Sequence, residues 1–504
     1  MIRSKYGIAY NNLTVLEGDK KQKNHTKMMK NLITIILLLL TFSGFSQDTS
    51  KKWTLEECIR YAFDNNINIK QSLLDLENAD INESDAIGNF LPSFNVNASN
   101  NWNSGLTQDV VTGILVNQVT RNFSTGGTVG VNVFNGLQNW KTLQAAKLSR
   151  LASQYSLEQM EDDISLAVAN AYLQVLVSKQ IRDVLIQQNE ITQQQLNQTR
   201  FQIDAGTVPQ GDILELEATD ADEKRQIVIS ENDVKISLVS LAQLLLIEDY
   251  ENFEIADDSY DVPLTNLLNK DIDEIIEEAK KERYEVKIAE TNLEIAEKNL
   301  EISRGAYYPR LSAFFNYNTR ESDRNRVGFG GPDPDNPTRQ IGFVESTGEP
   351  VVTQNFLTVA LDPLPFIDQL WRNDGITYGL QLTIPVFNGF ATRNNVKRNM
   401  LNLERTQNQL KQTELDLEAN VYQAYVDAQG AAKAYDAAQK AVDAQQIAFD
   451  FAKERFDVGS ANSFDLNLSK IRLTNAENRL IQAKYDYIFR IKVLELFFGE
   501  RPVE

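Results

Sequence analysis

Three carboxylates stand where two helices are expected to begin, and their placement limits the chemistry that this chain can perform. Asp212 and Glu215 follow the turn Asp204–Pro209. Asp465 follows the matching turn Asp457–Asn462. A ring of carboxylates at a constriction would select for cations. The same residue types also stabilise helix starts, as a capping box or through the helix dipole, and the residues alone leave both roles open.

Enzymatic chemistry is not expected, because the residues that usually carry it are scarce. The 504 residues include one cysteine, Cys58, and one histidine, His25. A single cysteine excludes an intramolecular disulfide framework and a cysteine-based metal site, and one histidine excludes most imidazole chemistry. The sequence contains neither a nucleophile elbow nor a phosphate-binding glycine loop. We therefore predict a protein that is not an enzyme and that uses no cofactor and no metal.

The first 46 residues have the pattern of an upstream extension followed by a secretory signal. Lys27 and Lys30 precede the apolar run 32–42, and the small-residue stretch 43–46 ends it, so cleavage is expected before Gln47. A short membrane anchor is the alternative, although the run is short for a span. Residues 1–46 carry seven basic and two acidic side chains, so their removal shifts the net charge from −20 to −25. Such an acidic surface repels nucleic acid.

The chain contains an internal duplication of one sequence unit. Val133–Gly136 recurs as Val386–Gly389, at an offset of 253 residues. Further residues repeated at this offset are Ala171, Tyr172, Gly206, Asp212 and Leu241. The earlier part of each half matches at an offset of 217, as Pro92 and Pro309 show. The second half therefore carries a 36-residue insertion, at about 320–370, where six of the twelve prolines lie, and we expect a long irregular surface loop there.

Each half is predicted to contain a helix, two strands joined by a loop, a long helix, a turn and a last helix. The first repeat, residues 47–250, has helices 54–90, 138–205 and 211–247 and strands 92–103 and 125–134. The second repeat, residues 276–499, has helices 276–305, 391–457 and 463–498 and strands 309–319 and 375–386. Residues 251–275 form a linker between the repeats, and residues 500–504 form a tail.

The two long helices need partners along their whole length, because each would span about 100 Å. An apolar stripe with alternating spacings of four and three runs along residues 391–457, and its members are Ala424, Ala428, Ala431, Tyr435, Ala438, Val442, Phe449, Ala452 and Phe456, with Gln445 as a polar exception. This spacing is typical of coiled coils. Gly206 and Gly459 follow the long helices and supply left-handed caps, so each half forms an antiparallel helical hairpin. A plain coiled-coil rod is the alternative.

The strands alternate apolar and polar side chains, which is typical of strands with one face in lipid. Residues 93–99 follow this alternation, and Phe314 is an exception in the second half. Trp102, Tyr317 and Tyr378 lie towards strand ends, where an aromatic girdle is expected. A soluble sheet that caps a helical bundle is the alternative. Four strands cannot close a membrane β-barrel, so copies must join through their strands, three copies giving twelve strands and two giving eight.

The duplication, the Val-Phe-Asn-Gly motif after each strand pair and the glycine turns before Asp212 and Asp465 resemble the TolC-like outer-membrane efflux protein family over residues 53–499. The resemblance implies a mainly α fold with a membrane β-barrel, as a homotrimer. Its twelve strands would lie in the outer membrane of a Gram-negative envelope, on a twelve-helix tunnel in the periplasm. The segment 248–275 and both chain termini would form a belt around the tunnel.

The resemblance also implies where the channel entrance lies. The hairpin turns would form the periplasmic tip, where the tunnel narrows and a periplasmic adaptor docks through Gly206, Thr207, Val208, Gly459, Ser460 and Ala461. Asp212 and Asp465 match the aspartates of the family's gate, with Glu215 one turn further on. The tyrosine and arginine that lock this gate in the family are replaced here by Phe456 and Ala461, which puts such a lock in doubt.

We therefore predict an outer-membrane channel of a tripartite efflux or type I secretion system. It would be a passive exit duct for small molecules or proteins, with outer-membrane lipid, an adaptor and an inner-membrane pump as its partners and with no role for nucleic acid. The alternative is a soluble periplasmic coiled-coil scaffold. Discrete conductance in lipid bilayers would favour the duct, and a monodisperse protein in the absence of detergent would favour the scaffold.

Overall fold

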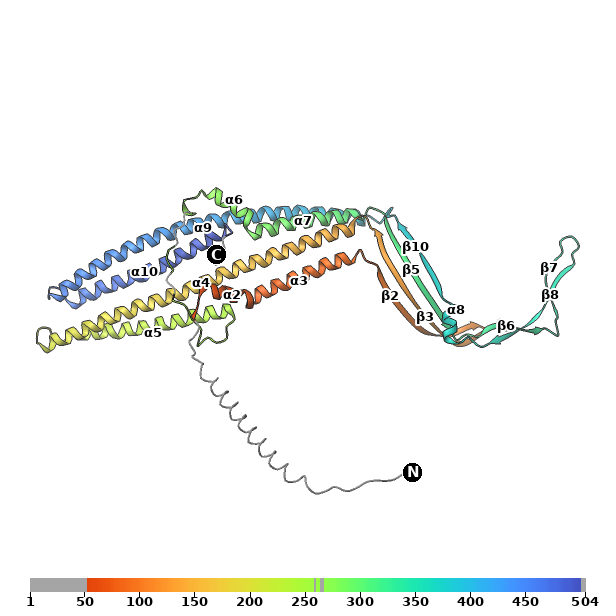
Figure 1. The fold of residues 1–504 in the computed structure, drawn as a ribbon, viewed down its shortest axis with the longest axis horizontal. Coiled ribbons are helices and arrows are strands. Elements are labelled where there is room, and N and C mark those ends of the chain that lie inside the picture. Colours follow the sequence, from red (N-terminus) through yellow and green to blue (C-terminus); the bar gives the residue numbers. More distant parts are fainter. Residues whose placement is uncertain (1–51, 258–259, 263–266, 500–504) are drawn as a thin grey trace, which may run out of the picture.

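The computed structural model describes residues 52–257, 260–262 and 267–499. Figure 1 shows a long helical body, a sheet at one of its ends and a narrow ribbon that projects beyond the sheet. The predicted signal and extension, part of the linker and the tail lie outside the described residues. Within the described ranges no helix is both long enough and apolar enough to cross a membrane.

The elements follow the duplicated order of helix, two strands, long helix and last helix. The helices are α2 (Leu55–Asn65), α3 (Ile67–Gly88), α4 (Gln138–Asp204), α5 (Asp212–Leu245), α6 (Ile272–Glu282), α7 (Tyr284–Gly305), α8 (Phe366–Arg372), α9 (Ala391–Asp457) and α10 (Ser463–Leu496). The strands are β1 (Lys52–Trp53), β2 (Ser93–Gln108), β3 (Leu115–Phe134), β4 (Glu254–Ile255), β5 (Arg310–Ser322), β6 (Arg326–Pro332), β7 (Thr338–Phe343), β8 (Pro350–Gln354), β9 (Phe356–Leu361) and β10 (Gly375–Thr383). A 3₁₀ turn, η1, covers Leu267–Asn269.

The first helix of each repeat is broken in two, so the prediction of continuous helices at 54–90 and 276–305 was wrong. The breaks fall at Asn66 (φ −60°, ψ 133°) and at Arg283 (φ −71°, ψ 132°), which are 217 residues apart. Each short helix before the break buries its apolar face on a long helix, through residues such as Ile59 and Ile275. The chain changes direction after each docked short helix, and a single residue in an extended conformation makes this turn possible.

The long helices α4 and α9 have 67 residues each, or about 100 Å. The predicted stripe of α9 is confirmed, because all of its residues are buried or partly buried in the single chain. Phe449 of the stripe packs in one cluster with Leu466 and Leu473 of α10 and with Ile191 of α4. The two hairpins therefore share a core and do not merely lie side by side.

The central sheet has the order β10-β5-β3-β2 with antiparallel pairing throughout. The predicted strands 92–103, 125–134 and 309–319 are too short, since β2 and β3 pair as far as Gln108 and Leu115, and β5 runs to Ser322. The turn between β2 and β3 is held by Asp109, whose Oδ1 accepts hydrogen bonds from the backbone N–H groups of Val111 and Thr112 at 3.0 and 2.8 Å. The strands thus reach further from the helical body than the alternation indicates.

The insertion is not the irregular loop that its composition predicts. β6 pairs with β9 and β7 pairs with β8, which makes a two-stranded ribbon in two sections, and α8 follows (Figure 1). Proline is compatible with these strands because it stands at their ends, with Pro332 last in β6 and Pro350 first in β8. The prolines and glycines of the insertion therefore mark the ends of its strands, and its composition did not predict the strands between them.

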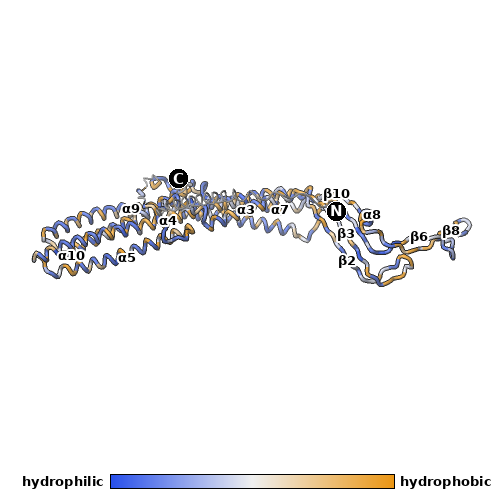
Figure 2. Tube along the Cα trace, turned by 60° about the horizontal axis from the view of Figure 1, so that its bottom comes forward, coloured by the Kyte–Doolittle hydropathy of each residue, from blue (hydrophilic) through white to orange (hydrophobic). Residues whose placement is uncertain are grey.

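The sheet has one face that is more apolar and one that is more polar, because apolar and polar residues alternate along much of β2 and β5. Figure 2 shows that the strands contain both hydrophobic and hydrophilic residues. Phe94, Phe315 and Tyr378 belong to the apolar face, because each is in register with an apolar residue or a glycine of the adjacent strand. Phe314 falls on the polar face, where its ring lies against Gly379, whose missing side chain leaves room for it. The exception in the alternation is thus accommodated by a glycine across the strand.

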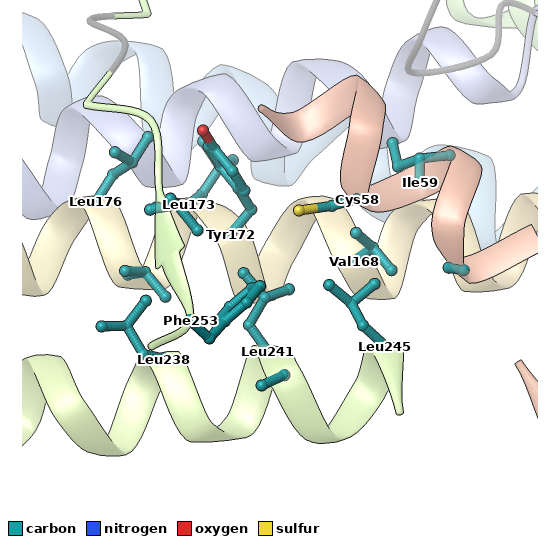
Figure 3. Close-up of a cluster of buried hydrophobic side chains, with 14 of the residues drawn as sticks. Cys58, Ile59, Val168, Tyr172, Leu173, Leu176, Leu238, Leu241, Leu245 and Phe253 are labelled. Atoms are coloured by element: carbon teal, nitrogen blue, oxygen red, sulfur yellow. The ribbon is translucent and has the colours of Figure 1, made fainter. Parts of the chain in front are cut away.

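Short elements lie against the middle of the long helices and form a belt, which consists of α2, β1, β4, η1 and α6. Figure 1 shows α2 and α6 on different sides of the helical body. The largest core of the belt is drawn in Figure 3 and includes Cys58, Ile59, Val168, Tyr172, Leu241, Leu245 and Phe253. The Tyr172 hydroxyl donates to the carbonyl of Ala256 at 3.1 Å, and the Tyr425 hydroxyl donates to the carbonyl of Leu268 at 3.0 Å. The repeated tyrosines thus hold the belt to both long helices.

Candidate functional site

The two hairpin turns at the end of the helical body are built in the same way. Gly206 and Gly459 have φ of 74° and 75°, which places both in the left-handed region. The backbone N–H of Thr207 donates to the carbonyl of Gln202 at 3.0 Å, and its hydroxyl donates to the same oxygen at 2.9 Å. Ser460 repeats both bonds onto Arg455, at 2.8 and 3.1 Å. The hydroxyl residues of the tip are therefore helix caps as well as surface groups.

One hollow of 690 Å³ joins the two turns. Residues that line it and that the sequence singles out are Thr207, Val208, Gly459, Ser460, Ala461 and Asp465. Glu215 does not line this hollow but a second one of 460 Å³, which lies between α5 and α10 beside Asp222 and Asn467. The structure therefore brings Asp465 together with both turns and separates Glu215 from it.

The helix starts show where the acids of the tip stand relative to the helix caps. The cap of α10 is Asn462, whose Oδ1 accepts a hydrogen bond from the backbone N–H of Asp465 at 2.8 Å. Asp465 is thus in the first turn with an exposed side chain. The cap position of α5 is Gly211, which makes no side-chain bond, and Asp212 is the first residue of the helix. The side chain of Asp212 lies outside the described part of the structure.

A buried polar cluster above the tip was not predicted from the sequence. Lys470 of α10 and Glu223 of α5 are 2% and 5% exposed, and the ammonium donates to Glu223 Oε1 at 2.7 Å. The hydroxyl of Thr192 on α4 donates to Glu223 Oε2 at 2.5 Å, and Asn189 Nδ2 donates to the same oxygen at 3.2 Å. Burial lowers the pKa of the Lys470 ammonium, and the neighbouring Glu223 opposes this shift.

The sequence does carry a signal for this cluster. Lys470 lies four residues after Leu466 and three before Leu473, both of which are buried, so it occupies a seam position of α10. Glu223 stands seven residues after the buried Leu216. A charged residue at a seam position indicates a buried pair, because it can be accommodated there only with a partner.

The described residues contain no group of three or more side chains that would suit a metal ion. The candidate site is a polar tip on two helical hairpins, at the end of the helical body opposite the sheet (Figure 1). Long paired helices that carry a sheet with one apolar face are typical of a protein that inserts its strands into a membrane.

Several solved structures share the fold. A membrane protein from Pseudomonas aeruginosa superposes with a TM-score of 0.66 at 16% identity, over 90% of this chain and 93% of that chain. VceC from Vibrio cholerae gives a TM-score of 0.65 at 13% identity, over 88% of this chain and 94% of that chain. CusC gives 0.67 at 15% identity, over 88% and 91% of the two chains. No curated protein matches the sequence significantly.

The family model described as outer membrane efflux protein matches residues 59–245 and 275–495. The two matched segments coincide with the two repeats. The chain therefore belongs to the outer membrane efflux protein family, and it is an outer-membrane channel of efflux systems. This is a family of transport channels and not of enzymes. The sheet lies in the outer membrane, and the helical body extends into the periplasm.

Proposed function

We propose that three copies of this chain form a passive exit duct, which a periplasmic adaptor connects to an inner-membrane pump. The observation that carries the proposal is the pair of open sheet edges. In the order β10-β5-β3-β2 the outer strands are β10 and β2, and each has one partner strand among the described residues. Unpaired backbone groups are not tolerated in lipid, so these edges must pair with neighbouring copies, and three copies supply twelve strands.

The helical hairpins support the same assembly. α3 contacts α4, α4 contacts α7, and α7 contacts α9, so these helices pack side by side in one row. Three copies would continue this row into a closed tunnel. Cargo would then pass from the periplasm to the outside without a chemical step.

The tip is proposed as the entrance and as the docking site of the adaptor. Gly206, Thr207 and Val208 would meet the adaptor in one hairpin, and Gly459, Ser460 and Ala461 would meet it in the other. Their support is the repeated turn geometry, which presents equivalent backbone groups on both hairpins. Asp465, Asp212 and Glu215 would give the entrance its preference for cations.

Planar lipid bilayers test the duct directly. The detergent-purified protein should insert and give discrete conductance steps, with potassium permeating better than chloride. A protein that is extracted without detergent, or that inserts without conducting at any voltage, would contradict the proposal. Type I secretion and tripartite efflux would be distinguished by deleting the gene and measuring drug susceptibility and secreted protein separately.

A further inference from the structure

The short helix α8 lies on the apolar face of the sheet, at the end that is farthest from the helical body. The odd-numbered residues 311–317 of β5 form part of the apolar face, and alternation puts Thr319 and Glu321 on the same face. The Thr319 hydroxyl donates to the carbonyl of Leu370 in α8 at 2.6 Å. α8 therefore covers the outer end of the face that meets lipid.

The residues beneath α8 mark the upper limit of the apolar band. Arg121 of β3 pairs with Glu321 of β5 at 2.7 Å, and Glu321 is 4% exposed. Phe366 of α8 packs on Phe123, with 5.2 Å between ring centroids, and the Arg121 guanidinium lies over the Phe366 ring. A charge pair on a lipid-facing surface is unfavourable unless it is covered. α8 supplies that cover.

The length of the band agrees with this boundary. On β2 this face carries Phe94, Val96, Ala98 and Trp102, with Asn100 as a polar exception, and Trp102 is in register with Arg121. Eight residues of strand span about 27 Å, or roughly 21 Å of height at a tilt of about 40°. A membrane band is about 25 Å tall, so α8 falls at the level of the lipid headgroups of the outer leaflet.

The side of α8 turned away from the sheet carries two exposed apolar residues, which neighbour the exposed charged residues Asp368 and Arg372. Ile367 and Trp371 are four residues apart, so they project from one side of the helix. They are 58% and 74% exposed, whereas Gln369, which bonds the backbone of Ser322, is buried against the sheet. Tryptophan is enriched where a protein surface crosses the membrane–water interface.

We propose that α8 is an interfacial anchor, with Ile367 and Trp371 inserted between the headgroups and the upper acyl chains of the outer leaflet. The lipid surface is favoured over a second copy of the chain by direction. A neighbouring copy reaches the sheet through the edges of β2 or β10, within the plane of the sheet. α8 instead projects out of that plane, on the side where the apolar band already meets lipid.

Fluorescence of single-tryptophan variants tests the proposal, because the chain has four tryptophans, Trp53, Trp102, Trp140 and Trp371. In a variant with phenylalanine at the other three positions, Trp371 is expected to be quenched by phosphatidylcholine that is brominated near the headgroup. Bromine near the acyl-chain ends should quench it less. Matched variants that keep only Trp102 or only Trp53 provide a membrane reference and a belt reference.

Two results would overturn the proposal. Quenching of Trp371 by aqueous iodide, with none by brominated lipid, would place α8 in water. Protection from both quenchers would place it against a second copy. Trp371→Phe in the otherwise unchanged chain gives the same information if the triple substitution fails to fold, because the part of the total fluorescence that brominated lipid quenches should then fall.

A charge on the free face provides the second arm. Ile367→Asp should at least halve the lipid quenching of Trp371, since the carboxylate draws α8 out of the interface. Ile341→Asp is the matched control, because Ile341 is 60% exposed on β7, in the ribbon beyond the sheet. Conductance confirms that both variants are assembled. Equal quenching in the two variants would contradict the anchor.

Discussion

The ammonium group of Lys470 lies 2.7 Å from the carboxylate of Glu223, and this contact joins the two helical hairpins of one chain. Lys470 belongs to α10 of the second hairpin, and Glu223 belongs to α5 of the first. Lys470 stands five residues beyond Asp465, so the pair lies about 8 Å along the helix from the tip. Any opening of the tip that separates the hairpins must strain or break this buried pair.

Lys470→Ala should therefore destabilise the protein strongly. The substitution leaves the Glu223 carboxylate buried without a counter-charge, which costs about 3–5 kcal/mol. Lys440→Ala is the matched control, because Lys440 pairs with Asp436 in an exposed i,i+4 contact whose loss costs less than about 1 kcal/mol. Thermal unfolding in detergent measures the difference. Equal melting temperatures of the two variants would show that the buried pair does not stabilise the closed hairpins.

Sequence could predict the features that are encoded locally. The stripe of α9 and the caps at Gly206 and Gly459 are formed by residues close in the chain, so their spacing reveals them. The break at Asn66 could not be predicted in this way, because it follows from how α2 docks on the belt core. The pairing of Lys470 with Glu223 likewise joins residues 247 positions apart, and no local pattern names the partner.

Acid should loosen the belt at Asp257. The Asp257 carboxylate accepts hydrogen bonds from Lys179 at 2.8 Å and from Lys52 at 2.6 Å. These bonds, the one from Lys179 most of all, hold the pKa of this carboxyl below its usual value of 3.8. The folded state thus binds this proton less readily than the unfolded state, and the stabilisation is present above pH 3.8. It is lost as the pH falls through the depressed folded pKa.

Hydrogen exchange of β4 between pH 5 and pH 3 is the measurement. The original chain should lose protection as the pH falls, and Asp257→Asn should show weaker protection at pH 5 with a smaller change. Asp75→Asn, at an exposed position of α3, is the control and should behave like the original chain. The same pH dependence in the Asp257→Asn variant would assign the loosening to another group.

Substitutions of Asp465 and of Asn462 should have different effects, the first on ion selectivity and the second on stability. Asn462 caps α10, so Asn462→Ala should cost about 1 kcal/mol of stability with little change in ion selectivity. Asp465→Ala keeps the cap and removes an exposed charge at the tip hollow, so it should lower the preference for cations. Bilayer reversal potentials and thermal unfolding measure the two effects. Unchanged selectivity with a lowered melting temperature for Asp465→Ala would assign it a structural role instead.

The duplication also predicts the contact between neighbouring copies. A Cβ atom at Gly136 would lie 2.2 Å from the carbonyl oxygen of Gly305, so the junctions of α4 and α7 meet at two glycines. Their counterparts at the offsets of 253 and 217 residues are Gly389 and Gly88, and neither has an atom within 4 Å of such a Cβ in the single chain. If three copies form a ring, α9 of one copy meets α3 of the next as α4 meets α7.

A cross-linking experiment distinguishes the two equivalent contacts. Lys141 of α4 and Glu301 of α7 form an ion pair of 2.5 Å, and their counterparts are Asn394 of α9 and Ser84 of α3. With Cys58→Ala as background, Asn394→Cys combined with Ser84→Cys should react with a short bismaleimide to give covalent oligomers, because the two cysteines come from neighbouring copies.

The matched pair Lys141→Cys and Glu301→Cys should cross-link within one chain and remain at the monomer mass on a denaturing gel, since both residues belong to one copy. Oligomers from Asn394→Cys and Ser84→Cys beside monomers from this control would establish that the second repeat of one copy packs against the first repeat of the next. Internal cross-links from the control, with no oligomers from the test pair in assembled protein, would mean that copies do not follow the pseudo-symmetry of the chain.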